Sequence, residues 1–293
     1  MRKVIPKDSV QENVKNYIEL GKLRLTSFVI LSALMGFCIG STTVDVIKAF
    51  WLCLGGLLIT MASNAMNQIY EIALDSKMVR TQNRPLPLGK LTVKQAQYFA
   101  TFSLISGYLI LSYFLNVKVA NLSMLSLVMY VYAYTPLKTK SSFAVFVGAF
   151  PGALPPMIGY VAATNQVDTV TWLIFGIQFL WQFPHFWAIA WLAFEDYQKA
   201  GIHLLPSKGG KDFYSALQIV IYTVFLVAVS ILPYLYGAVG LLYLILACVT
   251  GTIFIFQAVN LLIKRTRQAA LQLMFGSFFY LPTILITFYF DKI

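Results

Sequence analysis

Residues 67–85 read Asn67-Gln-Ile-Tyr-Glu71-Ile-Ala-Leu-Asp75-Ser-Lys77-Met-Val-Arg80-Thr-Gln-Asn83-Arg84-Pro85, and they follow directly on an apolar run, 48–68. A run of that length can cross a bilayer as one helix. Ionisable side chains beside such a run are costly and tend to be functional. The stretch therefore predicts a membrane helix that ends in a charged site, although a solvated helix end with incidental charges would share part of the pattern.

The spacing of the polar residues indicates the chemistry. Asn67, Glu71 and Asp75 recur every four residues, so their oxygens share one face if the helix continues through them. Mg²⁺ prefers oxygen ligands, keeps several waters and commonly bridges protein carboxylates to substrate phosphates. Cations able to neutralise the remaining phosphate charge follow in Lys77, Arg80 and Arg84. The pattern predicts metal-assisted phosphate chemistry at a membrane edge.

The composition of the whole chain predicts an all-α, polytopic membrane protein. Of its 293 residues, 59% are hydrophobic and 11% charged, and the mean hydropathy is +0.73, which excludes a soluble domain. Nine apolar windows are long enough for membrane helices and lack the strict alternation of barrel strands. They are 24–42, 48–68, 96–115, 119–136, 143–163, 169–190, 214–233, 237–261 and 269–289. We expect a single domain over 1–293, with residues 1–23 as a cytoplasmic tail.

The distribution of Lys and Arg predicts the orientation. The N-terminal segment through Arg24 and the loops after the second, fourth, sixth and eighth spans hold 19 of the 22 basic residues. By the positive-inside rule, the N-terminus and these loops lie in the cytoplasm and the C-terminus lies outside. The net charge of +11 follows from this topology and does not indicate nucleic-acid binding. Since the tail has no apolar signal-peptide core, we expect a multi-pass protein of a bacterial inner membrane.

A second carboxylate pair, Glu195 and Asp196, lies in the long loop after the sixth span, 191–213. Opposite the first motif, this pair could help to hold two or more metal ions on a diphosphate. Just upstream, Pro184 is expected to kink the span and re-aim His185. His185 is then an acid, a base or a ligand of a polar substrate group, or else a helix histidine bonded to a neighbour.

A third group of residues surrounds the fifth span. Tyr134 and Lys138 precede it, and Lys138 either joins the phosphate site or anchors the helix end at the membrane interface. The span itself, 143–163, is rich in Gly and Pro, residues that kink a membrane helix and bring backbones close together. It is expected to line a chamber for a bulky substrate, although tight helix packing would use the same residues.

Three motifs together carry a family resemblance. They are Asn67-x3-Glu71-x3-Asp75-Ser-x-Met78-x-Arg80-Thr81-x-Asn83-Arg84-Pro85-Leu86, then Trp181-Gln182-Phe183-Pro184-His185-Phe186, and Glu195-Asp196-Tyr197-x3-Gly201. The chain resembles the protohaem IX farnesyltransferases, or haem O synthases, a branch of the UbiA-type intramembrane prenyltransferases. The Trp-Gln-x-Pro-His-Phe run separates this branch from the quinone prenyltransferases. The first motif departs from many bacterial relatives, which carry Asp where this chain has Glu71 and Ala73.

The resemblance implies a nine-helix bundle of the UbiA type, with an apolar chamber capped by cytoplasmic loops. It implies an Mg²⁺-dependent enzyme that moves the farnesyl group of farnesyl diphosphate onto a vinyl group of haem b, giving haem O and diphosphate. Haem b would be a substrate and not a permanent cofactor. A haem A synthase or a terminal-oxidase assembly protein is the partner it suggests within the lipid bilayer.

From these motifs we assign expected roles to single residues. The metal-diphosphate would be held by Asn67, Glu71, Asp75 and Asp196, with Asp196 preferred to Glu195 because it precedes Tyr197. Contacts to diphosphate oxygens are assigned to Lys77, Arg80, Arg84 and Lys138. Further substrate contacts are assigned to Tyr134, Glu195 and Tyr197, and His185 is placed near haem as an iron ligand, a propionate contact or a base.

Two alternatives remain open. A prenyltransferase acting on a quinone precursor would use the same metal site, but its second motif should be richer in Asp. A membrane transporter would use carboxylates to bind protons or cations, but such residues are expected near the midplane, whereas these cluster at one membrane edge.

Overall fold

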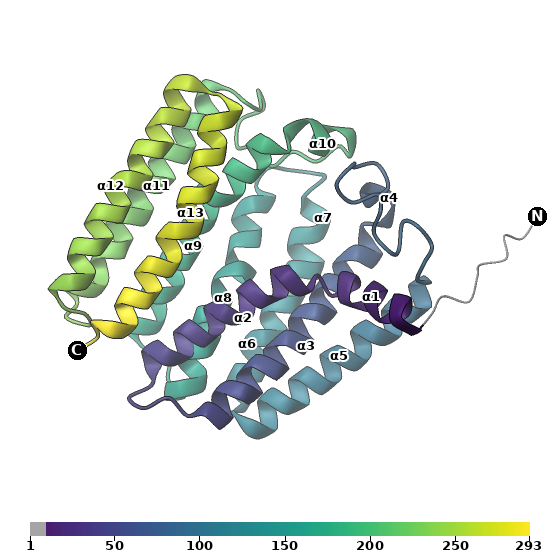
Figure 1. Ribbon diagram of the computed structural model, residues 1–293, viewed down its shortest axis with the longest axis horizontal. Helices are drawn as coiled ribbons and strands as arrows, with labels where there is room; N and C mark the ends of the chain where they lie inside the picture. Colours follow the sequence, from purple (N-terminus) through teal and green to yellow (C-terminus); the bar gives the residue numbers. More distant parts are fainter. Residues whose placement is uncertain (1–9) are drawn as a thin grey trace, which may run out of the picture.

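Nine long helical rods and three short helices make up residues 10–293, the part of the chain that the computed structural model describes (Figure 1). The rods are α2 (Leu23–Gly40), α3 (Val46–Tyr70), α5 (Val93–Phe114), the continuous rod of α6 (Val117–Val128), η1 (Met129–Tyr134) and α7 (Thr135–Leu137), α8 (Ala144–Thr164), α9 (Thr169–Leu192), α11 (Phe213–Leu235), α12 (Leu241–Lys264) and α13 (Arg267–Phe290). The short helices are α1 (Val10–Leu20), α4 (Ile72–Asp75) and α10 (Phe194–Lys199). Residues 1–9 of the predicted tail lie outside the described residues.

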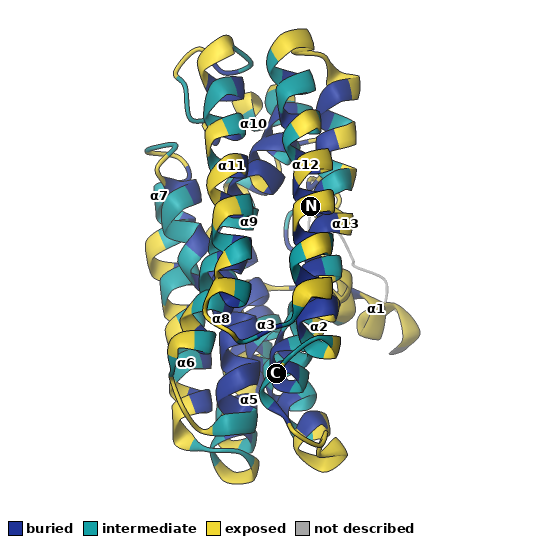
Figure 2. Ribbon diagram, turned by 90° about the vertical axis from the view of Figure 1, so that its left-hand side faces the viewer, coloured by how far each residue is buried: buried dark blue, intermediate teal, exposed yellow. Residues whose placement is uncertain are grey.

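The rods confirm the predicted all-α membrane fold. Within residues 10–293, eight of them are long and apolar enough to cross a membrane. The remaining one, α5, corresponds to the predicted span 96–115 and packs along α3, but its serine, tyrosine and glutamine side chains make it more polar. Figure 2 shows exposed residues along the outer faces of the rods, and large apolar side chains such as Tyr113, Phe256 and Phe290 are among them. These faces suit lipid contact.

Side-chain caps determine where six of the helices begin. In each case the residue before the helix accepts a hydrogen bond from a backbone N–H of the first turn, which satisfies one of the otherwise unpaired donors there. The capping residues are Asp45, Thr92, Asn116, Asp168, Asp212 and Thr266. The capping residues therefore define the first turn of these six helices.

The rods α2 and α8 pack with their backbones in contact. A Cβ atom on Gly36 would collide with the carbonyl group of Pro156, and one on Gly159 would collide with that of Ala33. Small residues permit this approach between membrane helices. One apolar core lies among α9, α11, α12 and α13, and a second lies among α2, α3, α5, α6 and α8. The C-terminal half of α8, which contains Gly159, has the predicted role in tight helix packing. Gly148 and Gly152, in its N-terminal half, line a cavity.

The loops that carry the charged motifs lie at one end of the bundle. Short helices α4 and α10 are both in this cap, whereas the C-terminus lies at the opposite end (Figure 1). There, Lys292 Nζ donates hydrogen bonds to the carbonyl oxygens of Cys38 and Ile39. The fold thus gathers motifs that are separated by more than 100 residues in sequence.

The rod α3 ends before the first motif is complete. Glu71 follows Tyr70 with φ −101° and ψ 11°, and it separates α3 from the single turn of α4. The condition for Asn67, Glu71 and Asp75 to share one helix face, a helix that continues through all three, is therefore not met at Glu71. By contrast, α9 continues as a helix through Pro184 to Leu192.

Candidate functional site

A cavity of about 510 Å³ extends from the cap into the bundle. Its cap end is lined by charged and polar side chains, including Arg80 and Tyr197. Its inner part is lined largely by apolar residues of α2, α3 and α8, such as Ala33, Leu52 and Ile158. We call this cavity the chamber. A ligand with an anionic head and an apolar tail matches the polarity of its two ends.

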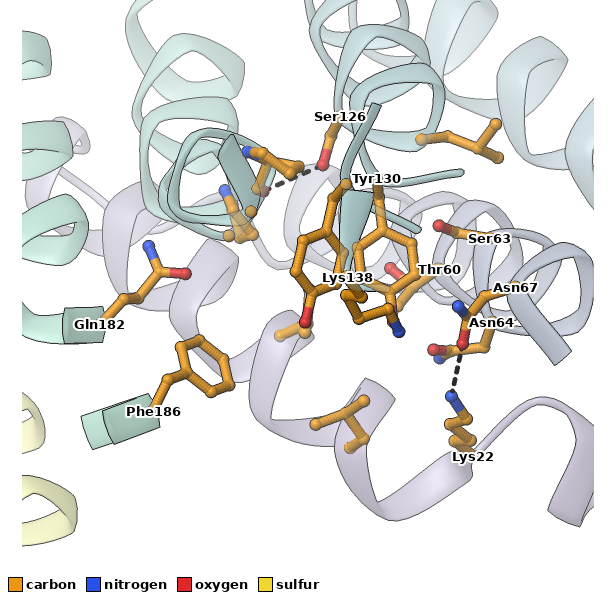
Figure 3. Close-up of a pocket in the computed structure, with 18 of the residues that line it drawn as sticks. Lys22, Thr60, Ser63, Asn64, Asn67, Ser126, Tyr130, Lys138, Gln182 and Phe186 are labelled. Atoms are coloured by element: carbon orange, nitrogen blue, oxygen red, sulfur yellow. Dashed lines mark hydrogen bonds between the residues drawn. The ribbon is translucent and has the colours of Figure 1, made fainter. Parts of the chain in front are cut away.

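Asn67, at the end of α3, connects three elements at the polar end of the chamber. Its Oδ1 accepts a hydrogen bond from Lys22 Nζ at 3.0 Å, and its Nδ2 donates one to Thr135 Oγ1 at 3.1 Å. Figure 3 shows Lys22, Asn67 and Lys138 directed toward the same region. The side chain of Asn67 is therefore fixed before any ligand binds.

The two carboxylates of the first motif are both buried and each faces a cation. Lys138 Nζ lies 2.5 Å from Glu71 Oε1, and Arg84 donates a hydrogen bond of 2.7 Å to Asp75 Oδ2. Glu71 retains 5% of its accessible surface and Asp75 retains none. Removing charges from water is costly unless they are paired, so these pairs account for the burial of both acids. Lys138, which was predicted to contact diphosphate oxygens, is thus paired with an acid of the first motif in the ligand-free site.

The same carboxylates fit a hard divalent cation. Asp75 Oδ1 is buried and has no hydrogen-bond partner in residues 10–293. An uncompensated carboxylate oxygen is costly to bury, and a cation would satisfy it. The described residues contain no group of three or more His, Cys, Asp or Glu side chains arranged around one point. The arrangement suits Mg²⁺, which needs only one or two protein carboxylates when water and phosphate complete its shell.

Four cations line the chamber and one predicted cation does not. Those lining it are Lys22, Arg80, Arg84 and Lys138. Lys77 is exposed on the loop after α4 and is not among the lining residues. The structure therefore brings together three of the four cations predicted for diphosphate and adds Lys22.

Lys22 was not predicted from the sequence. It lies between α1 and α2 in the left-handed backbone conformation, with φ 50°, and this turn directs its side chain to the chamber. Burial of the ammonium group, together with the nearby charges of Arg84 and Lys138, lowers its pKa to about 7. Gly21, the preceding residue, is typical of a turn in the chain. No residue pattern predicts that this turn directs Lys22 toward the acids.

The second acidic pair takes a different position from the first. Asp196 accepts hydrogen bonds from the backbone N–H groups of Val79, at 2.9 Å, and Arg80, at 3.3 Å. Asp196 therefore fastens the loop after α4 to α10, and it is not among the residues that line the chamber. Glu195 faces away, paired with Lys211 at 2.5 Å, and this hydrogen bond lowers the pKa of its carboxyl group.

Aromatic side chains border the polar end. The Lys138 ammonium lies 4.8 Å from the centre of the Tyr134 ring, and the Arg80 guanidinium lies 5.7 Å from that of Tyr197. Both tyrosines, predicted as substrate contacts, line the chamber. Tyr130 lines it as well and was missed; it shares the π-helical segment η1 with Tyr134. Short π-helical segments are frequent at functional sites, but no sequence pattern predicts them.

His185 lies on the side of α9 that faces α13. Its Nδ1 is 2.7 Å from Ser277 Oγ, and its ring stacks on Trp181 with centroids 4.4 Å apart. The histidine itself does not line the chamber, but its neighbour Phe186 does. The structure thus places His185 outside the set of residues that line the chamber and against α13.

Comparisons with known proteins give matches over most of the chain. Residues 29–281 match the UbiA prenyltransferase family. The protein named protoheme IX farnesyltransferase from Cytophaga hutchinsonii is 48% identical over 280 residues, which cover 94% of this chain and 97% of that protein.

Solved structures share the fold at low sequence identity. A structure described as digeranylgeranylglyceryl phosphate synthase has a TM-score of 0.80 and 22% identity, covering 96% of this chain and 98% of its own. A UbiA homolog from Archaeoglobus fulgidus bound to DMAPP and Mg²⁺ has a TM-score of 0.68 and 15% identity, covering 93% of this chain and 99% of its own. These two likenesses concern the fold alone.

Proposed function

The chain belongs to the UbiA prenyltransferase family and is a prenyltransferase, and from this premise we propose that it transfers the farnesyl group of farnesyl diphosphate to a vinyl group of haem b. The products would be haem O and diphosphate. The name of the relative from Cytophaga hutchinsonii supports the choice of both substrates.

One observation carries the proposal: two buried carboxylates and four basic residues meet at one end of a largely apolar chamber. The cap end suits a diphosphate with its metal, and the inner part suits an isoprenoid chain. Burial of Glu71 and Asp75 beside Lys138 and Arg84 means that the site is formed in advance and needs little reorganisation.

Mg²⁺ would be held by Asn67, Glu71 and Asp75, with Asp196 as the candidate from the second motif, and when bound it would neutralise charge on the departing diphosphate. The structure of the Archaeoglobus fulgidus homolog with DMAPP and Mg²⁺ supports such a metal in this fold. For Asp196 to join as a ligand, it would have to give up at least one of its backbone hydrogen bonds.

The side chains of this chain would act on the farnesyl group as follows. As the bond between C1 and the bridging oxygen breaks, the oxygen takes the electron pair, and Lys22, Arg84 and Lys138 stabilise the negative charge. The faces of Tyr130 and Tyr134 favour the allylic cation, while the apolar walls exclude water. The vinyl group supplies the electrons of the new C–C bond, and one water then adds with loss of a proton.

We further propose that the cap faces the cytoplasm across a bacterial inner membrane, with the C-terminus outside. The excess of Lys and Arg in the cap loops supports this orientation. A haem A synthase or a terminal-oxidase assembly protein is the partner proposed for receiving the product.

The proposed reaction is tested by incubating the purified full chain with haem b, farnesyl diphosphate and Mg²⁺ and searching for farnesylated haem by mass spectrometry. We expect product that disappears with EDTA and returns with added Mg²⁺. If haem stays unmodified and a quinone precursor is prenylated instead, the haem assignment fails. If neither acceptor reacts, the donor assignment also fails.

A further inference from the structure

Gln182 lies on α9 with its amide group held in one orientation by two backbone carbonyl groups. Its Nε2 donates hydrogen bonds to the carbonyl oxygens of Ala149, at 2.8 Å, and Gln178, at 3.2 Å. Both hydrogens of the NH₂ group are thereby used. The reverse orientation would place Oε1 against two carbonyl oxygens, so these contacts distinguish the oxygen from the nitrogen. The hydrogen bonds therefore fix Oε1 on the other side of the amide, away from both carbonyl groups.

The amide oxygen of Gln182 faces the chamber and is not used by the protein. Gln182 is among the residues that line the chamber, and Figure 3 shows its side chain directed into it, beside Phe186. Only 2% of the residue is exposed, and over residues 10–293 no N–H or O–H group donates a hydrogen bond to Oε1. A buried acceptor without a donor is costly. This oxygen therefore needs a donor from a molecule that enters the chamber.

Two glycines of α8 place this oxygen relative to the Tyr134 ring. A Cβ atom on Gly148 would lie 2.7 Å from that ring, and one on Gly152 would collide with Gln182 Oε1. Residues four apart on one helix face have Cβ atoms about 5–6 Å from each other. Because α8 begins shortly after Lys138, at the polar end of the chamber, the oxygen lies about one helical turn further inward than the ring.

A water molecule is the donor that fits this oxygen during the proposed reaction. The farnesyl chain and the vinyl group are hydrocarbons, so neither can donate a hydrogen bond to it. Once the new C–C bond has formed, the positive charge lies on the vinyl carbon attached to the macrocycle, and a water must add there. A water that donates one hydrogen to Gln182 Oε1 keeps its lone pairs free for that carbon.

We propose that Gln182 Oε1 holds the water that adds to the haem-derived cation. This inference rests on the proposed function and names the residue that controls its last step. An electron pair of the water oxygen forms the new C–O bond, one O–H bond breaks, and the proton passes to an oxygen of the released diphosphate. Gln182 is a positioning residue, because an amide oxygen is too weak a base to take that proton itself.

The test measures which product each full-length variant makes from haem b, farnesyl diphosphate and Mg²⁺ in lipid nanodiscs. Without a held water, the cation instead loses a proton from the adjacent carbon and forms a C=C bond, giving a farnesylated haem that is lighter by one water. Gln182→Met keeps the length of the side chain and removes the amide oxygen. By mass spectrometry, it should raise the ratio of dehydrated to hydroxylated product by about tenfold or more, with total farnesylated haem nearly unchanged.

Two further variants separate the water from the packing of α9. Gly152→Ala should shift the ratio in the same direction with Gln182 intact, because the added methyl group displaces its oxygen. Gln178→Met is the matched control. Gln178 lies one turn earlier on α9 and also contacts Gly152, by donating to its carbonyl oxygen at 3.4 Å, but it does not line the chamber. This control should keep the product ratio of the unmodified chain.

Binding of Mg²⁺–farnesyl diphosphate shows which variants are folded, and if Gln182→Met does not bind it, the ratio given by Gly152→Ala decides. An unchanged ratio in the deciding variant, or an equal shift in Gln178→Met, would overturn the inference, while farnesylated haem from the unmodified chain would still support the proposed function. Loss of all farnesylated haem in a folded Gln182→Met would also overturn it, since the C–C bond forms before the water adds. Absence of farnesylated haem from the unmodified chain would overturn both.

Discussion

At the residue scale, the site depends on acids that are buried before any metal arrives. Asp75 is fully buried, and only its Oδ2 is satisfied, by Arg84 at 2.7 Å. Breaking a buried pair leaves an uncompensated charge, whereas an amide in place of the carboxylate keeps the shape and removes the charge. Substitution by Asn is therefore a sharper probe of chemistry than substitution by Ala.

We expect Asp75→Asn to insert into the membrane and fold, but to lower the rate of farnesyl transfer by about 100-fold or more, since one charged metal ligand is lost. The measurement is product formation by mass spectrometry at saturating Mg²⁺. Glu195→Gln is the control, because Glu195 lies on the surface facing Lys211, and it should retain nearly full activity. Near-normal turnover by folded Asp75→Asn would contradict the assignment of this residue to the metal.

Lys22 should make both the stability of the protein and the binding of diphosphate depend on pH. Burial holds its pKa at about 7, below the ordinary value of 10.5. Between these values the unfolded chain binds the proton and the folded chain does not, so the free energy of unfolding of the ligand-free protein should rise with pH from about 7 to 10. A bound diphosphate favours the ammonium form of Lys22 and should therefore raise the pKa of this group again.

Binding of inorganic diphosphate with Mg²⁺ should therefore take up a proton through Lys22 at alkaline pH. From a free-state pKa of about 7, the uptake should approach about 0.9 proton at pH 8 and nearly vanish at pH 6. Calorimetry in two buffers of different ionisation enthalpy measures it. Lys22→Met corrects for protonation of the ligand itself, and equal proton uptake by the variant and the unmodified chain would rule out this role.

At the scale of elements, the packing of α2 on α8 positions one wall of the chamber. Gly159 allows the backbones to touch, and a methyl group there would meet the Ala33 carbonyl, which cannot move without shifting α2. Gly159→Ala should destabilise the protein by about 1–3 kcal/mol. Gly176 on α9 has only an ordinary contact with Val229 at 3.4 Å. Thermal unfolding in one detergent should show Gly176→Ala unchanged or slightly more stable, and equal effects at both glycines would contradict the packing argument.

The link between α10 and the loop after α4 is also an element-scale feature. Asp196→Asn should loosen the loop 76–84, because its hydrogen bonds to the N–H groups of Val79 and Arg80 become weaker. Hydrogen exchange of these two amides should accelerate, and the KM for farnesyl diphosphate should rise. A direct ligand role predicts in addition a higher requirement for Mg²⁺, so a metal titration of the variant distinguishes the two roles.

At the scale of the whole molecule, the sequence predicts the rods better than it predicts the site. The apolar windows locate the membrane helices because length and hydropathy decide that property locally, as for 169–190 against α9. They miss the break at Glu71 and the π-helical segment that contains Tyr130, because hydropathy does not report the local course of the backbone. Residue spacing found Asn67, Glu71 and Asp75, which share the chamber. It could not find Lys22, because that lysine reaches Asn67 through a left-handed turn that residue spacing does not predict.

Membrane orientation is likewise a property of the whole molecule. The cap holds most of the Lys and Arg residues, and the C-terminus lies at the other end of the rods. Placing the cap in the cytoplasm therefore places the C-terminus outside. The three cysteines, Cys38, Cys53 and Cys248, all lie within rods, which permits replacement by Ala. On that background, Lys208→Cys in the cap and Ile293→Cys at the C-terminus are exposed reporters. In intact bacterial cells, an impermeant maleimide should label the cysteine at 293 and leave that at 208 unlabelled until the membrane is opened. Labelling of position 208 alone would invert the proposed topology and place the diphosphate site outside the cytoplasm.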